Sequence, residues 1–496
     1  MNSRPKKTRL MDQTEILANA DEEGKSKDWI DELPSCIVSY ILSLLTIKDA
    51  WDASLVSRRW QEHLWNSILT RPNLEFDIPN IFGSRYAGAK FTDTTSDSIR
   101  LINQFKTPDF VQRVNAVLKH YRGKKVESFK VAFFLDGSTA NLDNWIRFAI
   151  TKGVEVLHLH LFHDPIHGTK KYVFPYELLS ELKSSTLKHL SLHRCVLRPS
   201  PDHFDRFNQL TSLCLNQVDL GETFLQACMF SVCLFLESLT LIRCHLDSCL
   251  IVSGSLLHLN DLKLFQCFNL SRIEISALNL ISFEYTGRIP TISFIQAPRL
   301  SRIYFWGLNN DTIANANALT QFASTPALET LQLLIVQEVP QSIPTFRYIK
   351  QLDLNIVLGE KSDYNVHDLM LVLNLLKATP VLEELVIKVR HPKYSEKNQQ
   401  ERTEISGFAH DCLRRVKMQG FQSNACEIEF AIWLLKYSLK LEIMVIDPFG
   451  DMYLGGDMWE AIDAYGLRSA RSWEEHRAFV QKELKRVQTH AQVIVL

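Results

Sequence analysis

Leucine and other apolar residues return at a regular spacing along the middle of the chain. The pattern LxxLxLxx(C/N)xL reads most clearly as LKHLSLHRCVL from Leu187, LTSLCLNQVDL from Leu210, LESLTLIRCHL from Leu236 and LNDLKLFQCFNL from Leu259. Weaker copies begin at Leu280, Leu300, Leu328, Ile349 and Leu382, and earlier ones at Val126 and Val154. Seven steps lead from Leu187 to Ile349, with a mean of about 23 residues each. A repeated period of this length predicts an array of similar structural units.

The spacing within each unit predicts a short strand at LxL, because its two leucines fall on one face of the pleat. A period of about 20–29 residues is typical of leucine-rich repeats. Stacked units of that kind place parallel strands on a concave face, with helices or irregular segments on the convex face, which is an α/β solenoid. Cys195, Cys244 and Cys267 fall at the C/N position. We expect them to be buried thiols that pack beneath the neighbouring turn.

The residues between the core leucines are expected to face outward from the concave surface. By this register the outward residues include His158, His160, His189, His193, Asn216, Thr240, Lys263, Phe265, Glu284, Arg302, Tyr304, Trp306, Gln332, Asp353, Asn355 and Lys388. Aromatic side chains on a rigid surface favour protein recognition, whereas the alternative is a strand face that is merely solvated. The predicted target-binding residues are His160, His193, Phe265, Arg302, Tyr304 and Trp306.

A different pattern occupies residues 28–70, where the apolar positions follow a helical period. Pro34 suits the first position of a helix, where its missing N–H costs nothing. Ile37, Ile41, Leu44 and Leu45 then recur at helical spacing. This pattern predicts the first of three short helices.

Two further helices are predicted before residue 70. Thr46 and Asp49 resemble a capping box that opens a second helix through Leu55, and Ser57 is placed to cap a third. The third helix carries Trp60, Leu64 and Trp65. So small a unit buries little surface, and we expect large apolar groups to remain exposed and to require a partner. These groups are Leu33, Ile41, Trp60 and Trp65.

The order Leu33-Pro34, Ile41-Leu42-Ser43-Leu44-Leu45 and Leu55-Val56-Ser57-Arg58-Arg59-Trp60 resembles the F-box. In that family the three-helix unit docks on a Skp-type adaptor, which links it to a cullin-RING ubiquitin ligase. The resemblance implies that an adaptor-binding surface is formed or supported by Leu33, Pro34, Ile37, Ile41, Leu45, Val56, Ser57 and Trp60. Trp51 and Asp52 stand where small or basic residues are more usual. Packing of these apolar residues against the chain's own repeats is the alternative.

The repeat rhythm loosens in the polar segment 390–406. Beyond it we predict a strand over 413–418, a turn at Gly420-Phe421, a helix over 427–437 and a strand over 441–446. This segment, with Leu441-Glu442-Ile443-Met444, resembles the FBD domain of plant F-box/leucine-rich-repeat proteins. The resemblance implies a cap on the apolar end of the solenoid, a task that terminal repeats must perform. A charged helical pattern follows over 472–487.

These patterns divide the chain into six predicted segments. They are a disordered tail (1–27), an F-box (28–70), a linker or N-terminal cap (71–119), leucine-rich repeats (120–400), an FBD-like cap (401–448) and a C-terminal helical extension (449–496). The predicted fold class is therefore α/β, with a three-helix F-box followed by a capped solenoid.

Composition narrows the partners and the chemistry. The 496 residues carry 55 basic and 56 acidic side chains, so no global field attracts nucleic acid or a membrane. The longest strongly apolar run, 227–236, is too short to span a bilayer. Residues 1–27 lack the apolar segment of a secretory signal, and the basic stretch 4–9 is either a nuclear import address or the basic end of a flexible tail. We expect the chain in the nucleus and/or the cytoplasm.

Candidate chemistry is sparse. Ten cysteines form no CxxC pair, and the common nucleotide-binding, metalloprotease and nucleophile-elbow motifs do not occur. His158, His160, His163 and His167 lie within ten residues of sequence, with Asp164 adjacent. A metal site is one reading of them, and exposed polar residues on a repeat strand are the other, which the missing ligand spacing favours. We therefore predict no metal, no cofactor and no enzymatic activity.

Taken together, these modules predict a substrate-recognition subunit of a Skp–cullin–F-box ubiquitin ligase. The F-box would dock the adaptor, and through it a cullin, while the repeats would hold an unknown protein target. The alternative is a leucine-rich-repeat scaffold that binds a partner without promoting its degradation.

Overall fold

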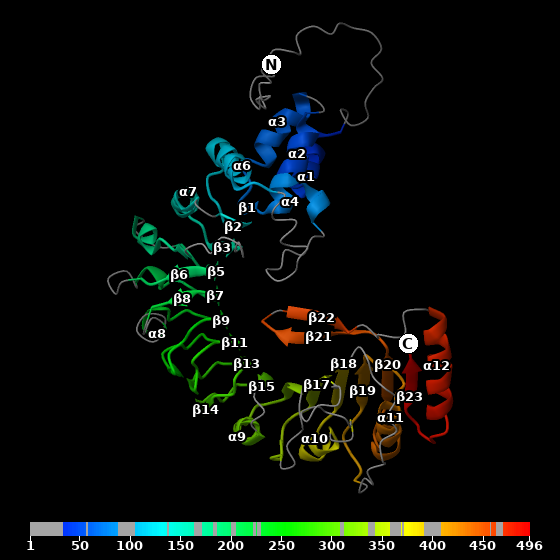
Figure 1. The fold of residues 1–496 in the computed structure, drawn as a ribbon. Helices are drawn as coiled ribbons and strands as arrows, with labels where there is room; N and C mark the ends of the chain where they lie inside the picture. The colour runs from blue at the N-terminus through cyan, green and yellow to red at the C-terminus, as the bar shows by residue number, and fades with distance from the viewer. Residues whose placement is uncertain are drawn as a thin grey trace, which may run out of the picture. The chain divides into compact units, whose positions relative to one another are not determined.

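The computed structural model describes residues 33–55, 58–87, 105–135, 138–162, 171–181, 186–199, 205–221, 225, 230–307, 312–335, 343–357, 369, 372–390, 408–456, 458–462 and 470–496 (Figure 1). These residues form two compact units. The first takes its residues from 1–71, 78–90 and 112–124, and the second from 72–77, 91–111 and 125–496.

The first unit contains the three predicted helices, α1 (Ser35–Leu44), α2 (Ile47–Ser54) and α3 (Arg58–Ser67). Pro34 is the N-cap of α1, one position before the predicted one, and its carbonyl accepts hydrogen bonds from the amides of Ile37 and Val38. The side chain of Thr46 accepts a hydrogen bond from the Asp49 amide at 3.1 Å and caps α2 as predicted.

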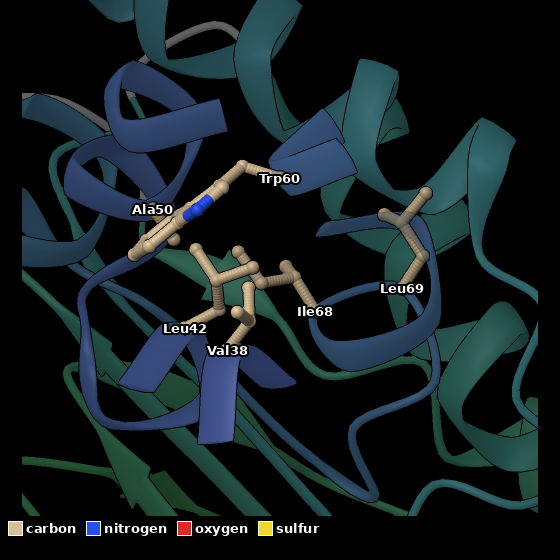
Figure 2. Packing of buried hydrophobic residues seen from close by; sticks show 6 residues of the cluster. All are labelled: Val38, Leu42, Ala50, Trp60, Ile68 and Leu69. Carbon is tan, nitrogen blue, oxygen red and sulfur yellow. The ribbon is translucent and has the colours of Figure 1, made fainter. Parts of the chain in front are cut away.

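The core of this unit is small and entirely apolar. Its buried residues are Val38, Leu42, Ala50, Trp60, Ile68 and Leu69, and Figure 2 shows the Trp60 ring facing Val38 and Leu42. Val117, on helix α6 (Thr107–His120), packs against the same core. The unit also contains α4 (Ile78–Phe82) and a 3₁₀ turn, η1 (Ser84–Tyr86). Residues from the predicted linker thus help to complete the helical unit.

The second unit is built on one sheet of fifteen strands in which every neighbouring pair is parallel. In spatial order the strands are β1 (Asn73–Phe76), β2 (Ser128–Phe133), β3 (Val156–Leu161), β5 (His189–His193), β7 (Ser212–Asn216), β9 (Ser238–Ile242), β11 (Asp261–Phe265), β13 (Ser282–Gly287), β15 (Arg302–Gly307), β16 (Thr330–Ile335), β17 (Gln351–Val357), β18 (Glu384–Arg390), β19 (Arg415–Gln419), β20 (Ile443–Asp447) and β23 (Gln492–Val495). The leucine-rich-repeat prediction is therefore confirmed.

The core leucines stack in register from strand to strand. Leu190 pairs with Leu213, and Leu213 pairs with Leu239 on the next strand. All three are almost fully buried. Cys195, Cys244 and Cys267 are also buried, as predicted, and burial raises the pKa of each thiol. They act as small apolar residues whose protonated thiols contact backbone carbonyls.

Shorter strands and helices lie on the outer side of the large sheet (Figure 1). Two small parallel sheets contain β4 (Tyr172–Val173), β6 (Cys195–Leu197) and β8 (Asp219–Leu220), and β10 (Cys249–Val252), β12 (Arg272–Ser276) and β14 (Thr291–Gln296). The helical segments are α7 (Thr139–Thr151), η2 (Tyr176–Glu181), α8 (Phe230–Val232), α9 (Thr312–Ala323), α10 (Val372–Ala378) and α11 (Ala425–Tyr437).

The carboxyl-terminal region extends the repeat array beyond the predicted cap. The strand–helix–strand order of β19, α11 and β20 is confirmed, and a capping box of Asn424 and Glu427 opens the helix. However, β20 is not the edge of the sheet, because β23 pairs with it on its far side. Helix α12 (Ala470–Leu484) contacts α11. The region also holds an antiparallel hairpin that the sequence did not predict, β21 (Gly450–Gly455) and β22 (Met458–Ile462).

Candidate functional site

The first candidate surface is the exposed side of helix α1. Ile37, Tyr40 and Leu44 are 41%, 62% and 68% exposed, and their spacing places them along one side of the helix. Val38 and Leu42 point instead into the core of the unit. Helix α1 is therefore apolar on two sides, and folding of the described residues buries only one of them. An exposed apolar stripe of this kind marks an interaction site.

Two further exposed apolar residues lie on and next to helix α2. Trp51, on the helix, and Leu55, at its C-cap, are four residues apart and both exposed. Arg71 secures the junction between α1 and α2, because its guanidinium donates to the carbonyl oxygens of Leu42 and Leu45. The exposed groups are thus held on a fixed backbone rather than on a loose segment.

The structure places most of the eight predicted adaptor-binding residues. Pro34 and Ile37 are exposed, and Leu33, Ile41 and Leu45 are half-buried against the core. Val56 and Ser57 lie outside the described residues, as does the side chain of Trp65.

The expectation that Trp60 is exposed is wrong. The indole is 7% exposed, because it fills the space between α1 and α2 and forms part of the core. Tyr40, Leu44 and Leu55 were absent from the predicted surface. The helical spacing of Tyr40 and Leu44 with Ile37 is the sequence signal that identifies those two residues, whereas Leu55, at the C-cap of α2, lies outside this pattern.

The second candidate surface is the concave face of the large sheet, beginning with its amino-terminal strands. The rings of His160 on β3 and His193 on β5 meet edge to face with centroids 4.2 Å apart. The pKa of both imidazoles is lowered, to about 4 for His160, mainly by burial and in addition by neighbouring positive charge, which includes that of Arg194. The two rings are therefore neutral at physiological pH. His193 is buried rather than open as predicted, since the neighbouring ring covers it.

A metal site finds no support in this region. Among the described residues, no group of three His, Cys, Asp or Glu side chains is placed to hold a metal ion. His163, Asp164 and His167 lie outside the described residues. None of the described helices has the length and apolar character needed to cross a membrane.

The centre of the concave face is covered by the hairpin β21–β22, which lies on the inner side of the sheet (Figure 1). Phe265 and Tyr304, predicted to be open, are 1% and 6% exposed. Trp306 is half-buried against a cluster formed by Leu334 and the hairpin residues Met452 and Ile462. Of the six predicted target-binding residues, only Arg302 is exposed, and His160 is half-buried.

Hydrogen bonds fix the hairpin to the sheet around one buried carboxylate. Tyr453 donates its hydroxyl hydrogen to Oε2 of Glu284 at 2.8 Å, and the Gly456 amide donates to Oε1 at 2.6 Å. The Tyr304 hydroxyl donates to the Tyr453 carbonyl at 3.1 Å, and the two tyrosine rings pack edge to face at 4.9 Å. Burial, reinforced by the charge of Glu284, raises the pKa of Tyr304, so its hydroxyl stays a donor.

Ion pairs flank this contact on the later strands. Lys388 donates to Oδ2 of Asp353 at 3.0 Å, and Arg390 pairs with the hairpin residue Glu460 at 2.7 Å. Lys388 also lies 5.8 Å from the ring of the hairpin residue Trp459, which is itself 61% exposed. The hairpin therefore conceals one aromatic surface and presents another.

Comparison with known proteins identifies the family of the chain that carries these two surfaces. A family model of a leucine-rich-repeat domain, At1g61320/AtMIF1, matches residues 117–480, and an F-box domain model matches residues 30–73. The repeat match covers most of the chain. The chain therefore belongs to the plant family of F-box proteins with leucine-rich repeats.

Three Arabidopsis thaliana proteins illustrate this relationship. F-box/FBD/LRR-repeat protein At1g13570 is 24% identical over 441 residues, which cover 85% of this chain and 92% of the relative. F-box/LRR-repeat protein At3g59210 is 26% identical over 397 residues, which cover 73% of each chain. F-box protein At5g03100 is 27% identical over 252 residues, which cover 51% of this chain and 64% of the relative. The FBD-like segment lies within the repeat match, and its likeness to an FBD domain stays a prediction.

Proposed function

We propose that this chain is a non-catalytic substrate-recognition subunit of a Skp–cullin–F-box ubiquitin ligase. The observation that carries the proposal is the apolar stripe of Ile37, Tyr40 and Leu44, exposed on a helical unit that matches the F-box. In this proposal the stripe docks on a Skp-type adaptor, and through the adaptor the chain joins a cullin. The repeat solenoid holds a target protein close to the ubiquitin-conjugating machinery.

Burial of the stripe supplies a physical driving force for docking. Complete burial of one large apolar side chain is worth about 1.5–3 kcal/mol. The exposed residues of α1 and α2 offer several such groups, and hot spots of binding are formed by a few residues of this kind. Because the chain supplies proximity and orientation, it requires no nucleophile, metal or cofactor of its own.

A pull-down of the full chain with a purified Skp-type adaptor tests the docking step. We expect the wild type to bind, and the double variant Ile37→Asp, Leu44→Asp to bind at least about 100-fold more weakly, because charge replaces two apolar anchors. Leu257→Asp is the matched control, since Leu257 is a similarly exposed leucine of the second unit. Failure of the wild type to bind, or wild-type binding by the folded double variant, would show that the docking proposal is wrong.

The ligase role also has to be separated from that of a scaffold. Proteins that co-purify with the chain are compared with and without inhibition of the proteasome. A recognition subunit predicts that at least one bound protein accumulates and carries ubiquitin under inhibition, and that Ile37→Asp, Leu44→Asp abolishes the ubiquitin. Unchanged levels of every bound protein would favour the scaffold.

A further inference from the structure

The contact between the hairpin and the concave face has the chemistry of a bound ligand. Glu284 is 5% exposed, and both of its carboxylate oxygens accept hydrogen bonds from the hairpin, one from a tyrosine hydroxyl and one from a backbone amide. Lys263 lies 3.9 Å from the same carboxylate. The buried carboxylate of Glu284 on the sheet can therefore accept hydrogen bonds from one hydroxyl and one backbone amide, held a fixed distance apart.

Two glycines determine how closely the turn approaches the sheet. Gly455 and Gly456 have φ angles of +87° and +60°, in the left-handed region. A Cβ atom on Gly455 would lie 2.7 Å from Oγ1 of Thr286 and 2.9 Å from Cδ2 of Phe265. Any other residue there would clash with the sheet as well as strain the turn. The concave face therefore fits a turn of the form Tyr-x-Gly-Gly.

The hairpin nevertheless leaves polar groups of the sheet unsatisfied. Asn355 lies two residues before Val357 on β17, so the two side chains are on the same face of the sheet. Val357 packs against the cluster of Leu334 with the hairpin residues Met452 and Ile462, and Asn355 pairs in register with Leu334. The Asn355 side chain is fully buried, and neither its Oδ1 nor its Nδ2 atom has a hydrogen-bond partner among the described residues. The same holds for Nε1 of Trp306 and Oδ1 of Asp353. Buried groups without partners destabilise the covered arrangement and are uncommon in folded proteins.

The connection between hairpin and sheet consists of side-chain contacts and a few hydrogen bonds. Within the part of the chain that the structure describes, strands β21 and β22 pair only with each other, in a separate two-stranded antiparallel sheet. Removing the hairpin would therefore break no ladder of the large sheet. It would expose a surface that combines an acidic acceptor, aromatic rings and an amide, which is a composition suited to binding a polypeptide.

We propose that the concave face of β11–β18 is a receptor for a partner polypeptide that presents a Tyr-x-Gly-Gly turn, and that the hairpin occupies this receptor until such a partner displaces it. The hairpin supplies the tyrosine and the glycines, and the partner adds hydrogen bonds to the side chain of Asn355. This inference deepens the proposed function, because it rests on target recognition by the repeats. It does not depend on adaptor docking.

A peptide-binding experiment tests the receptor directly. In the full chain, residues 450–462 are replaced by a Gly/Ser linker of equal length, and retained folding is checked by circular dichroism. The probe is a fluorescently labelled peptide with the sequence of residues 449–462, extended by one cysteine at each end and closed by a disulfide bond between the two added cysteines. Its binding is followed by fluorescence anisotropy. We expect it to bind the linker variant at least about tenfold more tightly than the wild type, in which the tethered hairpin competes.

Matched substitutions identify the site of binding. Glu284→Gln in the linker variant, and Phe in place of the tyrosine in the peptide, should each weaken binding, whereas Glu329→Gln on an exposed ion pair should not. Absence of binding to the folded linker variant, or equal binding after Glu284→Gln, would overturn the proposal. If the linker variant does not fold, Gly456→Val is used in its place. The added side chain would crowd Phe265 and weaken the contact between the turn and the sheet. The same results are then expected, and the same results would overturn the proposal.

Native-state hydrogen exchange of the wild type tests the displacement. We expect the amides of β21 and β22, and that of Gly456, to exchange through an opening that leaves the ladders of β11–β17 protected. Exchange of these amides only on global unfolding would contradict a displaceable hairpin. The linker variant should still bind the Skp-type adaptor, so failure of adaptor docking and failure of the receptor are distinguishable.

Discussion

Large apolar side chains lie on helix α1 and on the centre of the concave sheet face, yet their surroundings differ. On α1, Ile37, Tyr40 and Leu44 remain exposed on a closed core that does not need them. On the sheet, Phe265 and Tyr304 are covered by a hairpin from the same chain. The comparison teaches that an apolar surface can be kept available for a partner in two ways. It can stay exposed to solvent, or it can be covered by a segment of the same chain that a partner replaces.

The largest expected effect separates the two sides of α1. Leu42→Ala removes a fully buried side chain from a small core and should lower the free energy of unfolding of the helical unit by about 2–5 kcal/mol. Leu44→Ala, two residues further on, should change it by less than about 0.5 kcal/mol and weaken adaptor binding instead. Urea unfolding followed by circular dichroism measures the first quantity. Equal destabilisation by the two variants would remove the distinction between core and docking side.

A smaller effect is expected at the covered surface. Tyr453→Phe removes the hydroxyl donor of a buried, charge-assisted hydrogen bond, and Glu284→Gln removes the charge and replaces one of the two acceptor oxygens by an NH2 group. Each should cost about 1.5–3 kcal/mol, with non-additive effects in the double variant. Glu329→Gln alters an exposed ion pair with Lys350, so its effect should stay below about 1 kcal/mol. Thermal unfolding of the wild type, the two single variants and the double variant gives the coupling energy between the Tyr453 hydroxyl and the Glu284 carboxylate. Strictly additive effects would mean that the hydroxyl and the carboxylate do not act together.

The smallest expected effect concerns pH at the amino-terminal end of the concave face. His193 is neutral in the folded state because burial lowers its pKa, whereas an unfolded histidine takes up a proton near pH 6.5. The unfolded state therefore binds more protons below that pH, and the contribution of His193 alone should lower the free energy of unfolding by about 1 kcal/mol between pH 6.5 and 5.5. His193→Gln should flatten this dependence. An unchanged slope of melting temperature against pH in the variant would refute the assignment.

The sequence was most informative where structure follows from local spacing. The positions of Leu190, Leu213 and Leu239 fix both the strands and their register, because a ladder of identical units can pair in only one way that buries every leucine. The cysteines of the repeat turns were predicted for the same reason. The capping pair of Thr46 and Asp49 likewise depends only on residues three positions apart.

Prediction failed where the outcome depends on distant residues. Glu284 and Tyr453 are 169 residues apart, and no periodic pattern connects a strand register with a hairpin so far along the chain. The burial of Trp60 depends on how three helices meet, whereas the motif specifies only their order. Arg194, Gln217, Arg243 and Gln266 adopt positive φ angles after successive strands, although none is a glycine. Their side chains hydrogen-bond in pairs, Arg194 to Gln217 and Arg243 to Gln266, which supports a turn that propensity alone disfavours.

The position of the hairpin in the chain has a consequence for the order of synthesis. Every strand that the hairpin covers is made before it, and 190 residues separate Phe265 from Gly455. At a synthesis rate of about 5–20 residues per second, strand β11 with Phe265 emerges roughly 10–40 s before the hairpin, and the later strands follow in that interval. During that interval a nascent chain presents its aromatic surface openly, so a partner that binds during translation would meet no competitor and would exclude the hairpin from the start.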